Sequence, residues 1–177
     1  LAGTDGFLSG VTLGSLSLDR DTVVVALDTS TAARSVADLS GIPEGVPLVN
    51  MDHHHDNEGF GTAVWVDPTS SSVGEMCWML LRNWGIPIPP EAAEALYTAI
   101  VTDCGNFAFS CTTPRTHQAA ADLLSLGVAP EKIDQLIRCS RTMEGLRLRG
   151  RALERVRSVG SFAAVTWIGK TDFQDTG

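Results

Sequence analysis

Two apolar stretches of the chain end in an aspartate, and two histidines directly follow one of these aspartates. Asp28 follows Val-Ala-Leu, whereas Asp52 follows Val-Asn-Met and stands next to His53 and His54. A third aspartate, Asp103, ends a long apolar run. Carboxylate oxygens together with imidazole nitrogens suit Mn²⁺ or Mg²⁺ better than a cation that prefers thiolates. The coincidence of these positions favours a divalent-metal cluster made of Asp28, His53 and Asp103.

Each of these residues also has a simpler interpretation. Asp28 can cap a helix that begins just after it, because an aspartate side chain accepts hydrogen bonds from the first helical amides. Asp103 stands two residues before Gly105 and can belong to a turn, and residues 53–55 can form a solvated polar loop. A carboxylate on an apolar surface, however, costs on the order of several kcal/mol unless a partner compensates it. On the residues alone, both interpretations stay open.

Short runs of β-branched residues alternate with longer segments of helical periodicity, and these elements must position the aspartates. Strands are predicted over residues 21–28, 47–52 and 62–66, with a last strand over 161–168. Helices are predicted over residues 31–39, 71–84, 91–101, 116–126, 130–138 and 143–158. This alternation predicts an α/β fold with a mainly parallel β-sheet flanked by helices.

The predicted topology explains how the aspartates can meet. In open parallel sheets the ligand crevice lies at the carboxyl ends of the strands, and both Asp28 and Asp52 end a strand. The helix over 91–101 is apolar nearly all round, so we expect it to be buried and to carry Asp103 into the interior.

The composition fits one ordinary globular domain. Of the 177 residues, 44% are hydrophobic and 19% are charged, which excludes a disordered chain. No apolar stretch is long enough for a membrane span, and the net charge of −8 argues against duplex DNA as a partner. Residues 131–157 carry eight basic and four acidic side chains, a run that can meet phosphate or form a solvated helix face. The four cysteines show neither zinc nor disulfide spacing, so we expect reduced thiols in the cytoplasm.

Three motifs together resemble those of a known family. Residues 50–57 (NMDHHHDN), followed by Phe60-Gly61, resemble the Asp-His-His motif of the DHH phosphoesterase superfamily. Residues 25–30 (VALDTS) resemble its preceding aspartate motif, and residues 102–107 (TDCGNF) resemble its later Asp-Thr-Gly-x-Phe motif. The resemblance runs from about residue 21 to residue 128 and is greatest to the oligoribonuclease/pAp phosphatase branch.

This resemblance implies a Rossmann-like domain and a role for each motif residue. Asp28 would bridge two divalent cations, and His53 and Asp103 would be further ligands. His54 would face the scissile phosphate as a catalytic residue, while Asp52 would orient the histidines, as a carboxylate beside a metal-bound imidazole usually does. The implied cofactor is Mn²⁺, two ions per site, with Mg²⁺ as an alternative.

The resemblance also implies a reaction. The protein would hydrolyse short single-stranded oligoribonucleotides to mononucleotides, and adenosine 3′,5′-bisphosphate as a second substrate. Arg34 and Asn57 would join His54 in binding the substrate. We expect a cytoplasmic homodimer with neither a membrane nor duplex DNA as a partner.

The chain also departs from the family pattern. The N-terminal His-x-x-Pro-Asp-x-Asp motif and the glycine-rich C-terminal substrate domain are absent, and Cys104 replaces the usual threonine. We therefore expect a fragment that is inactive alone: an incomplete catalytic domain over residues 1–158, then a last strand and the start of a linker over 159–177. Two alternatives remain: another DHH activity (single-strand exonuclease, cyclic dinucleotide phosphodiesterase or pyrophosphatase), or a metal-free interaction module.

Overall fold

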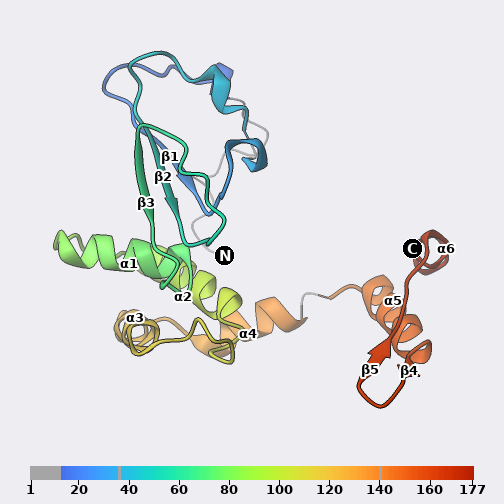
Figure 1. Ribbon diagram of the computed structural model, residues 1–177. Helices are drawn as coiled ribbons and strands as arrows, with labels where there is room; N and C mark the ends of the chain where they lie inside the picture. The colour runs from blue at the N-terminus through green and yellow to red at the C-terminus, as the bar shows by residue number, and fades with distance from the viewer. Residues whose placement is uncertain (1–12, 36, 140) are drawn as a thin grey trace. The chain divides into compact units, whose positions relative to one another are not determined.

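The computed structural model describes residues 13–35, 37–139 and 141–177 (Figure 1). The chain divides into two units, Leu1–Ala129 and Pro130–Gly177. The first unit contains a parallel sheet and three α-helices, and the second contains three α-helices and a two-stranded sheet. The catalytic-domain boundary expected at residue 158 stays a prediction. Within the described residues, no helix is long and apolar enough to cross a membrane.

The sheet of the first unit is built from three short strands in the order β1-β2-β3: β1 (Val24–Leu27), β2 (Leu48–Asp52) and β3 (Ala63–Val66). All pairings are parallel, with Val24 opposite Leu48 and Met51 opposite Trp65. The predicted α/β fold with a parallel sheet is confirmed. Because parallel strands end at the same edge, this register brings the residues that follow β1 and β2 together.

The prediction of a helix over residues 31–39 is wrong. The described residues of this segment form only two short 3₁₀ turns, Ala32–Arg34 and Leu39–Gly41. The side chain of Asp38 accepts a hydrogen bond from the Ser40 amide, a local bond that competes with helix formation. Ala33 and Arg34 are exposed, so the segment lacks the burial that stabilises so short a helix.

Three helices complete the first unit: α1 (Val73–Asn83), α2 (Pro90–Asp103) and α3 (Pro114–Ser125). Ser72 caps α1 by accepting a hydrogen bond from the Glu75 amide. The core is formed by Met76, Ile100 and Leu123, one from each helix, all fully buried. Met51 of β2 packs against α1 in the same cluster as Met76, which joins the sheet to the helices.

Helix α2 is buried on one face and not, as predicted, all round. Ala93, Tyr97, Ile100 and Val101 are buried, whereas Ala95 is exposed. Small apolar residues are compatible with both a buried and an exposed position. Their abundance in the sequence therefore did not reveal which face of α2 would pack against other helices. The buried face contacts both α1 and α3.

The second unit contains α4 (Pro130–Cys139), α5 (Met143–Glu154), β4 (Arg157–Val159), β5 (Ala163–Val165) and α6 (Lys170–Thr176). The helix predicted to reach residue 158 ends at Glu154, and the predicted last strand is shorter and pairs antiparallel with β4 in a separate hairpin. Gly160, at φ +59°, makes this turn possible. Helix α6 was not predicted.

The basic run in this unit has a structural role. Arg155 donates hydrogen bonds to both carboxylate oxygens of Asp172 at 2.5 and 2.7 Å, and Arg151 pairs with Asp172 and Asp175. These contacts attach α6 to α5, so part of the positive charge is neutralised within the unit.

Candidate metal centre

Asp28 and Asp52 lie side by side at the carboxyl edge of the parallel sheet. The Asp28 amide extends the ladder by donating to the Met51 carbonyl at 3.1 Å. Asp28 has φ +58°, a left-handed conformation that aspartate adopts more readily than most residues and that ends the strand. The helix-cap interpretation of Asp28 is excluded, because the next turn is a 3₁₀ turn whose N-cap is Thr31.

The three predicted ligands converge around one imidazole nitrogen. Nε2 of His53 lies 3.4 Å from Oδ1 of Asp28 and 3.8 Å from Oδ2 of Asp103. Nδ1 of His54 lies 3.9 Å from the same Asp28 oxygen. One potential ligand atom from each of Asp28, His53 and His54 lies within 4.8 Å of the others. The end of β1 and the loop after β2 thus supply the three atoms of this group, and the end of α2 places Asp103 beside His53.

The orientation of His53 makes this set suitable for a cation. Its Nδ1 lies 3.3 Å from the backbone carbonyl of Ser70, which can only accept a hydrogen bond. In the neutral ring Nδ1 therefore carries the proton, and Nε2 presents a lone pair to Asp28 and Asp103. Nε2 of His53 thus faces Oδ1 of Asp28 and Oδ2 of Asp103, and all three atoms are electron-rich. Such atoms repel one another unless a cation lies between them, so the residues fit a divalent metal ion.

The pKa of Asp103 and its position at the end of α2 also favour a cation beside it. Burial, followed by the negative charge of Asp28, raises the pKa of the Asp103 carboxyl. Asp103 is also the last residue of α2, where the unsatisfied carbonyls form the negative end of the helix dipole. A cation would relieve both effects.

Asp52 is fully buried and holds the residues around it. Its Oδ1 accepts hydrogen bonds from the His53 amide at 2.9 Å and from Nδ1 of His54 at 2.7 Å. Burial opposes ionisation, but hydrogen bonds from Asn57 and His54 outweigh it and lower the pKa of Asp52. The bond to Asp52 in turn raises the pKa of His54. Because Nδ1 of His54 is engaged, Nε2 is the ring atom left for another partner.

Asn57 and Arg34, both predicted to bind substrate, lie in different environments. The side-chain NH2 group of Asn57 donates a hydrogen bond to Oδ2 of Asp52 at 2.6 Å, and its side-chain oxygen accepts one from the backbone amide of Gly59 at 2.7 Å. The Asn57 side chain therefore holds the loop in place. Arg34 is more open: its side chain is 65% exposed and lies 3.9 Å from Asp56. For both residues, the role in substrate binding stays a prediction.

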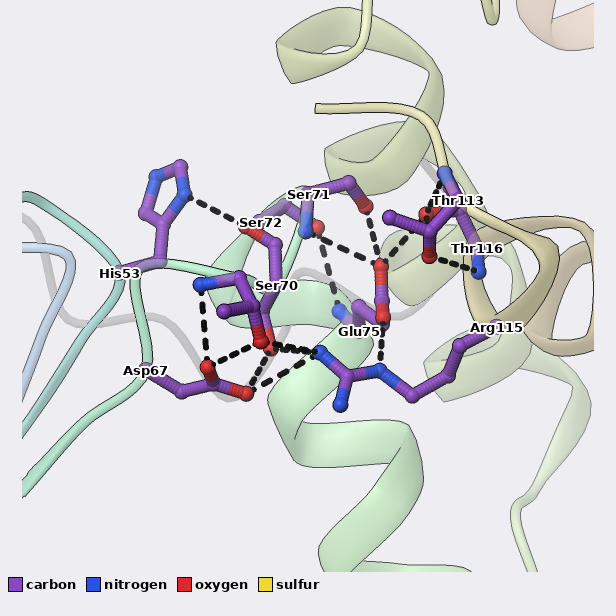
Figure 2. Close-up of polar contacts among 10 residues, drawn as sticks. His53, Asp67, Ser70, Ser71, Ser72, Glu75, Thr113, Arg115 and Thr116 are labelled. Carbon is purple, nitrogen blue, oxygen red and sulfur yellow. Dashed lines mark hydrogen bonds and ion pairs between the residues drawn. The ribbon is translucent and has the colours of Figure 1, made fainter. Parts of the chain in front are cut away.

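A polar network behind His53 received no role in the sequence analysis, although its residues lie within the stretch, from about residue 21 to residue 128, over which the family resemblance runs. It links the loop after β3 to α1 and α3 (Figure 2), through Asp67, Ser70, Glu75, Arg115 and Thr116. The acidic partners of Arg115 lie 40 and 48 positions away from it in the chain, so no local pattern reveals them.

Similarity to known proteins identifies the family of this chain. No protein-family model matches the chain. The chain is 35% identical over 133 residues to the bifunctional oligoribonuclease and PAP phosphatase NrnA of Thermus thermophilus, covering 75% of this chain and 40% of the relative. It is also 35% identical over 105 residues to the protein of the same name from Bacillus subtilis, covering 58% of this chain and 33% of the relative. The chain belongs to the DHH phosphoesterase superfamily. It spans less than half the length of either relative.

A solved structure shares the fold of this DHH chain. An exopolyphosphatase-related protein from Bacteroides fragilis superposes with a TM-score of 0.79 at 24% identity. The match covers 87% of this chain and 46% of that protein. Within the superfamily, the named relatives place the chain in the oligoribonuclease/PAP phosphatase branch.

Proposed function

We propose that this chain supplies the metal centre of a phosphodiesterase and phosphatase, which hydrolyses short oligoribonucleotides to mononucleotides and adenosine 3′,5′-bisphosphate to AMP. The observation that carries the proposal is the position of His53 Nε2, within 4 Å of the carboxylates of both Asp28 and Asp103. The two relatives at 35% identity bear names that contain both activities, which supports the choice of substrate.

Asp28, His53 and Asp103 would hold divalent cations, with Asp28 shared between two of them. An oxygen-rich donor set with imidazole suits Mn²⁺, and Mg²⁺ is the alternative. The bound cations would lower the pKa of a water molecule and neutralise charge on the phosphate oxygens. In the net reaction water cleaves one P–O bond, in the phosphodiester of an oligoribonucleotide or in the 3′-phosphomonoester of adenosine bisphosphate. The phosphorus takes the hydroxyl of the water, and the leaving oxygen takes the proton.

Residues around the metal centre would orient the substrate. Asp52 fixes the ring of His54 through Nδ1, which leaves Nε2 to face a substrate phosphate. The exposed guanidinium of Arg34 is suited to a second phosphate contact, because its fork of donors matches phosphate oxygens. Asn57 supports this arrangement by holding the second oxygen of Asp52.

The proposed setting is a cytoplasmic homodimer acting on single-stranded oligonucleotides or nucleotides. The net charge of −8 disfavours duplex DNA, and Cys77, Cys104 and Cys111 are free thiols, as in proteins of a reducing compartment. Light scattering of the purified protein would test the dimer.

The substitution Asp28→Asn tests the metal centre. Asparagine tolerates the left-handed backbone but removes the charge that both cations would share. Calorimetric titration of the chain should show stoichiometric Mn²⁺ binding, weakened at least ~10-fold in the variant. Release of mononucleotide from a diribonucleotide by the protein that carries this chain should fall by roughly two decades or more. The exposed His55 provides the control: His55→Ala should change neither quantity.

Three results would contradict this proposal. An Asp28→Asn protein that keeps its metal and its activity removes Asp28 from the centre. Wild-type protein that binds no Mn²⁺ and cleaves nothing supports a metal-free module. Faster cleavage of pyrophosphate or a cyclic dinucleotide than of a diribonucleotide assigns the chain to another DHH activity.

A further inference from the structure

We propose that Arg115 is a positioning residue for His53, acting through Asp67, Glu75 and the carbonyl of Ser70. We call these four residues the Arg115 network (Figure 2). The inference rests on the proposed function, because it concerns how His53 is presented as a metal ligand.

Ser70 links the network to the metal centre. Its carbonyl meets Nδ1 of His53 at 3.3 Å, and its amide donates to the Asp67 carbonyl at 3.0 Å. Its hydroxyl donates to Oδ2 of Asp67 at 2.8 Å and accepts from Nη2 of Arg115 at 2.9 Å. Ser70 is 1% exposed, so these partners, and not solvent, determine where its carbonyl lies.

The buried carboxylate of Glu75 also holds the guanidinium of Arg115. Its Nε donates to Oε1 of Glu75 at 2.5 Å, while Nη2 reaches Oδ2 of Asp67 at 3.0 Å. Glu75 is fully buried, and its Oε2 accepts from both the amide and hydroxyl of Ser71 and from the hydroxyl of Thr116. Both carboxylate oxygens of Glu75 thus accept hydrogen bonds, which makes the anchor rigid.

The geometry requires an arginine. One guanidinium contacts Glu75 with Nε and, with Nη2, both Asp67 and Ser70. A lysine has a single nitrogen and no planar fork, so it cannot hold these separated acceptors in the same arrangement.

The consequence reaches the metal centre through the tautomer of His53. With the Ser70 carbonyl fixed, the proton of the neutral ring stays on Nδ1 and Nε2 faces Asp28 and Asp103. If that carbonyl moves, the ring can carry its proton on Nε2 and lose its capacity to bind metal there. Loss of such an outer partner typically lowers metal affinity ~10–100-fold.

A purely structural role for Arg115 would lower stability without changing the tautomer. The control is Arg82, which pairs with Asp122 at 2.5 Å and links α1 to α3 away from His53. The variants to compare are Arg115→Met, Arg115→Lys and Arg82→Met, together with Asp67→Asn as a milder disturbance of the same network.

The experiment uses the full ¹⁵N-labelled chain. Two-bond ¹H–¹⁵N spectra report the tautomer of each of the four histidines, and calorimetry reports Mn²⁺ affinity. We expect the Nδ1–H form of His53 in the wild type and in Arg82→Met. In Arg115→Met and Arg115→Lys we expect a mixture of tautomers and an Mn²⁺ affinity reduced ~10–100-fold.

The proposal is overturned if folded Arg115→Met keeps the Nδ1–H form of His53 and an Mn²⁺ affinity within about twofold of the wild type. If Arg115→Met fails to fold, the Asp67→Asn variant tests the same proposal. An unchanged tautomer of His53 in that variant would refute the positioning role of the Arg115 network. Wild-type chain that binds no Mn²⁺ defeats the proposed function instead, while the tautomer spectra still test Arg115 separately.

Discussion

The carboxylates of the first unit differ in the donors that surround them. Asp52 and Glu75 are fully buried, yet hydrogen bonds overcome the burial and lower the pKa of each. Asp103 is affected mainly by burial and by the charge of Asp28, which raise its pKa. Ionised carboxylates that are fully paired hold structure, whereas a carboxyl held among like charges is suited to a cation.

At the scale of single residues, the lowered pKa of Asp67 leads to a prediction about stability in acid. Burial would raise its pKa, but hydrogen bonds from Thr69 and Ser70 and the charge of Arg115 lower it to about 2, below its ordinary 3.8. The ionised form therefore stabilises the fold above pH 3.8, and this contribution is lost as the pH falls towards about 2. The destabilisation caused by Asp67→Asn should be about 1–2 kcal/mol larger near pH ~5.5 than near pH ~2.5.

Urea unfolding at the two pH values measures this difference. The control is Asp122→Asn, which removes a surface partner of Arg82 and should cost less than about 1 kcal/mol at either pH. Equal destabilisation by Asp67→Asn at both pH values would show that its charge is not stabilising.

At the scale of elements, the contact between α1 and α2 depends on one glycine. A Cβ at Gly74 would lie 2.7 Å from Cβ of Ala99 and 3.0 Å from the Leu96 carbonyl. The absence of a side chain therefore lets the two helices approach closely. Helix α1 carries Glu75 of the Arg115 network and α2 carries Asp103 of the metal centre, so this close packing joins the two helices that bear them.

We predict that Gly74→Ala destabilises the chain by about 1–3 kcal/mol, because overpacking forces the helices apart. Gly150→Ala is a matched substitution in α5, at an exposed site with nothing within 4 Å of the added Cβ. It should instead stabilise its helix by roughly 0.5–1 kcal/mol, since alanine favours helix more than glycine. Chemical denaturation followed by circular dichroism compares the two, and a neutral Gly74→Ala would disprove the close contact.

At the scale of the whole chain, the candidate ligands Asp28, His53 and Asp103 all belong to the first unit. The second unit has its own charged centre, in which Asp172 pairs with Arg151 and Arg155. Metal binding should therefore stabilise the first unit directly, because a ligand that binds only the folded state favours it by mass action.

Hydrogen exchange tests this division. Saturating Mn²⁺ should slow amide exchange at the ends of β1 and β2 and in the last turn of α2, and leave α5 and α6 unchanged. Asp28→Asn should abolish the slowing. Protection spread equally over both units, or confined to the second, would contradict a centre made of first-unit residues.

Much of this architecture was predictable from sequence because it depends on local patterns. β-branched runs and helical periodicity identified the strands and helices that carry the site, and Asp28 and Asp52 were recognisable as the ends of neighbouring strands. The helix over 31–39 was mispredicted because its propensity was not supported by burial. The last strand was assigned to the wrong sheet because periodicity does not identify a pairing partner.

Only the tertiary structure determined how the site is held. The proton position on His53 depends on a carbonyl 17 residues away, and that carbonyl depends on Arg115, which lies 45 positions from Ser70. The hydrogen bond from Asn57 to Asp52 likewise joins the loop after β2 to the end of that strand in a way that the sequence did not indicate. The sequence by itself determined which residue types converge at the site. Hydrogen bonds require distances and angles that only the packed chain defines, so the fold decided which atoms of these residues face one another.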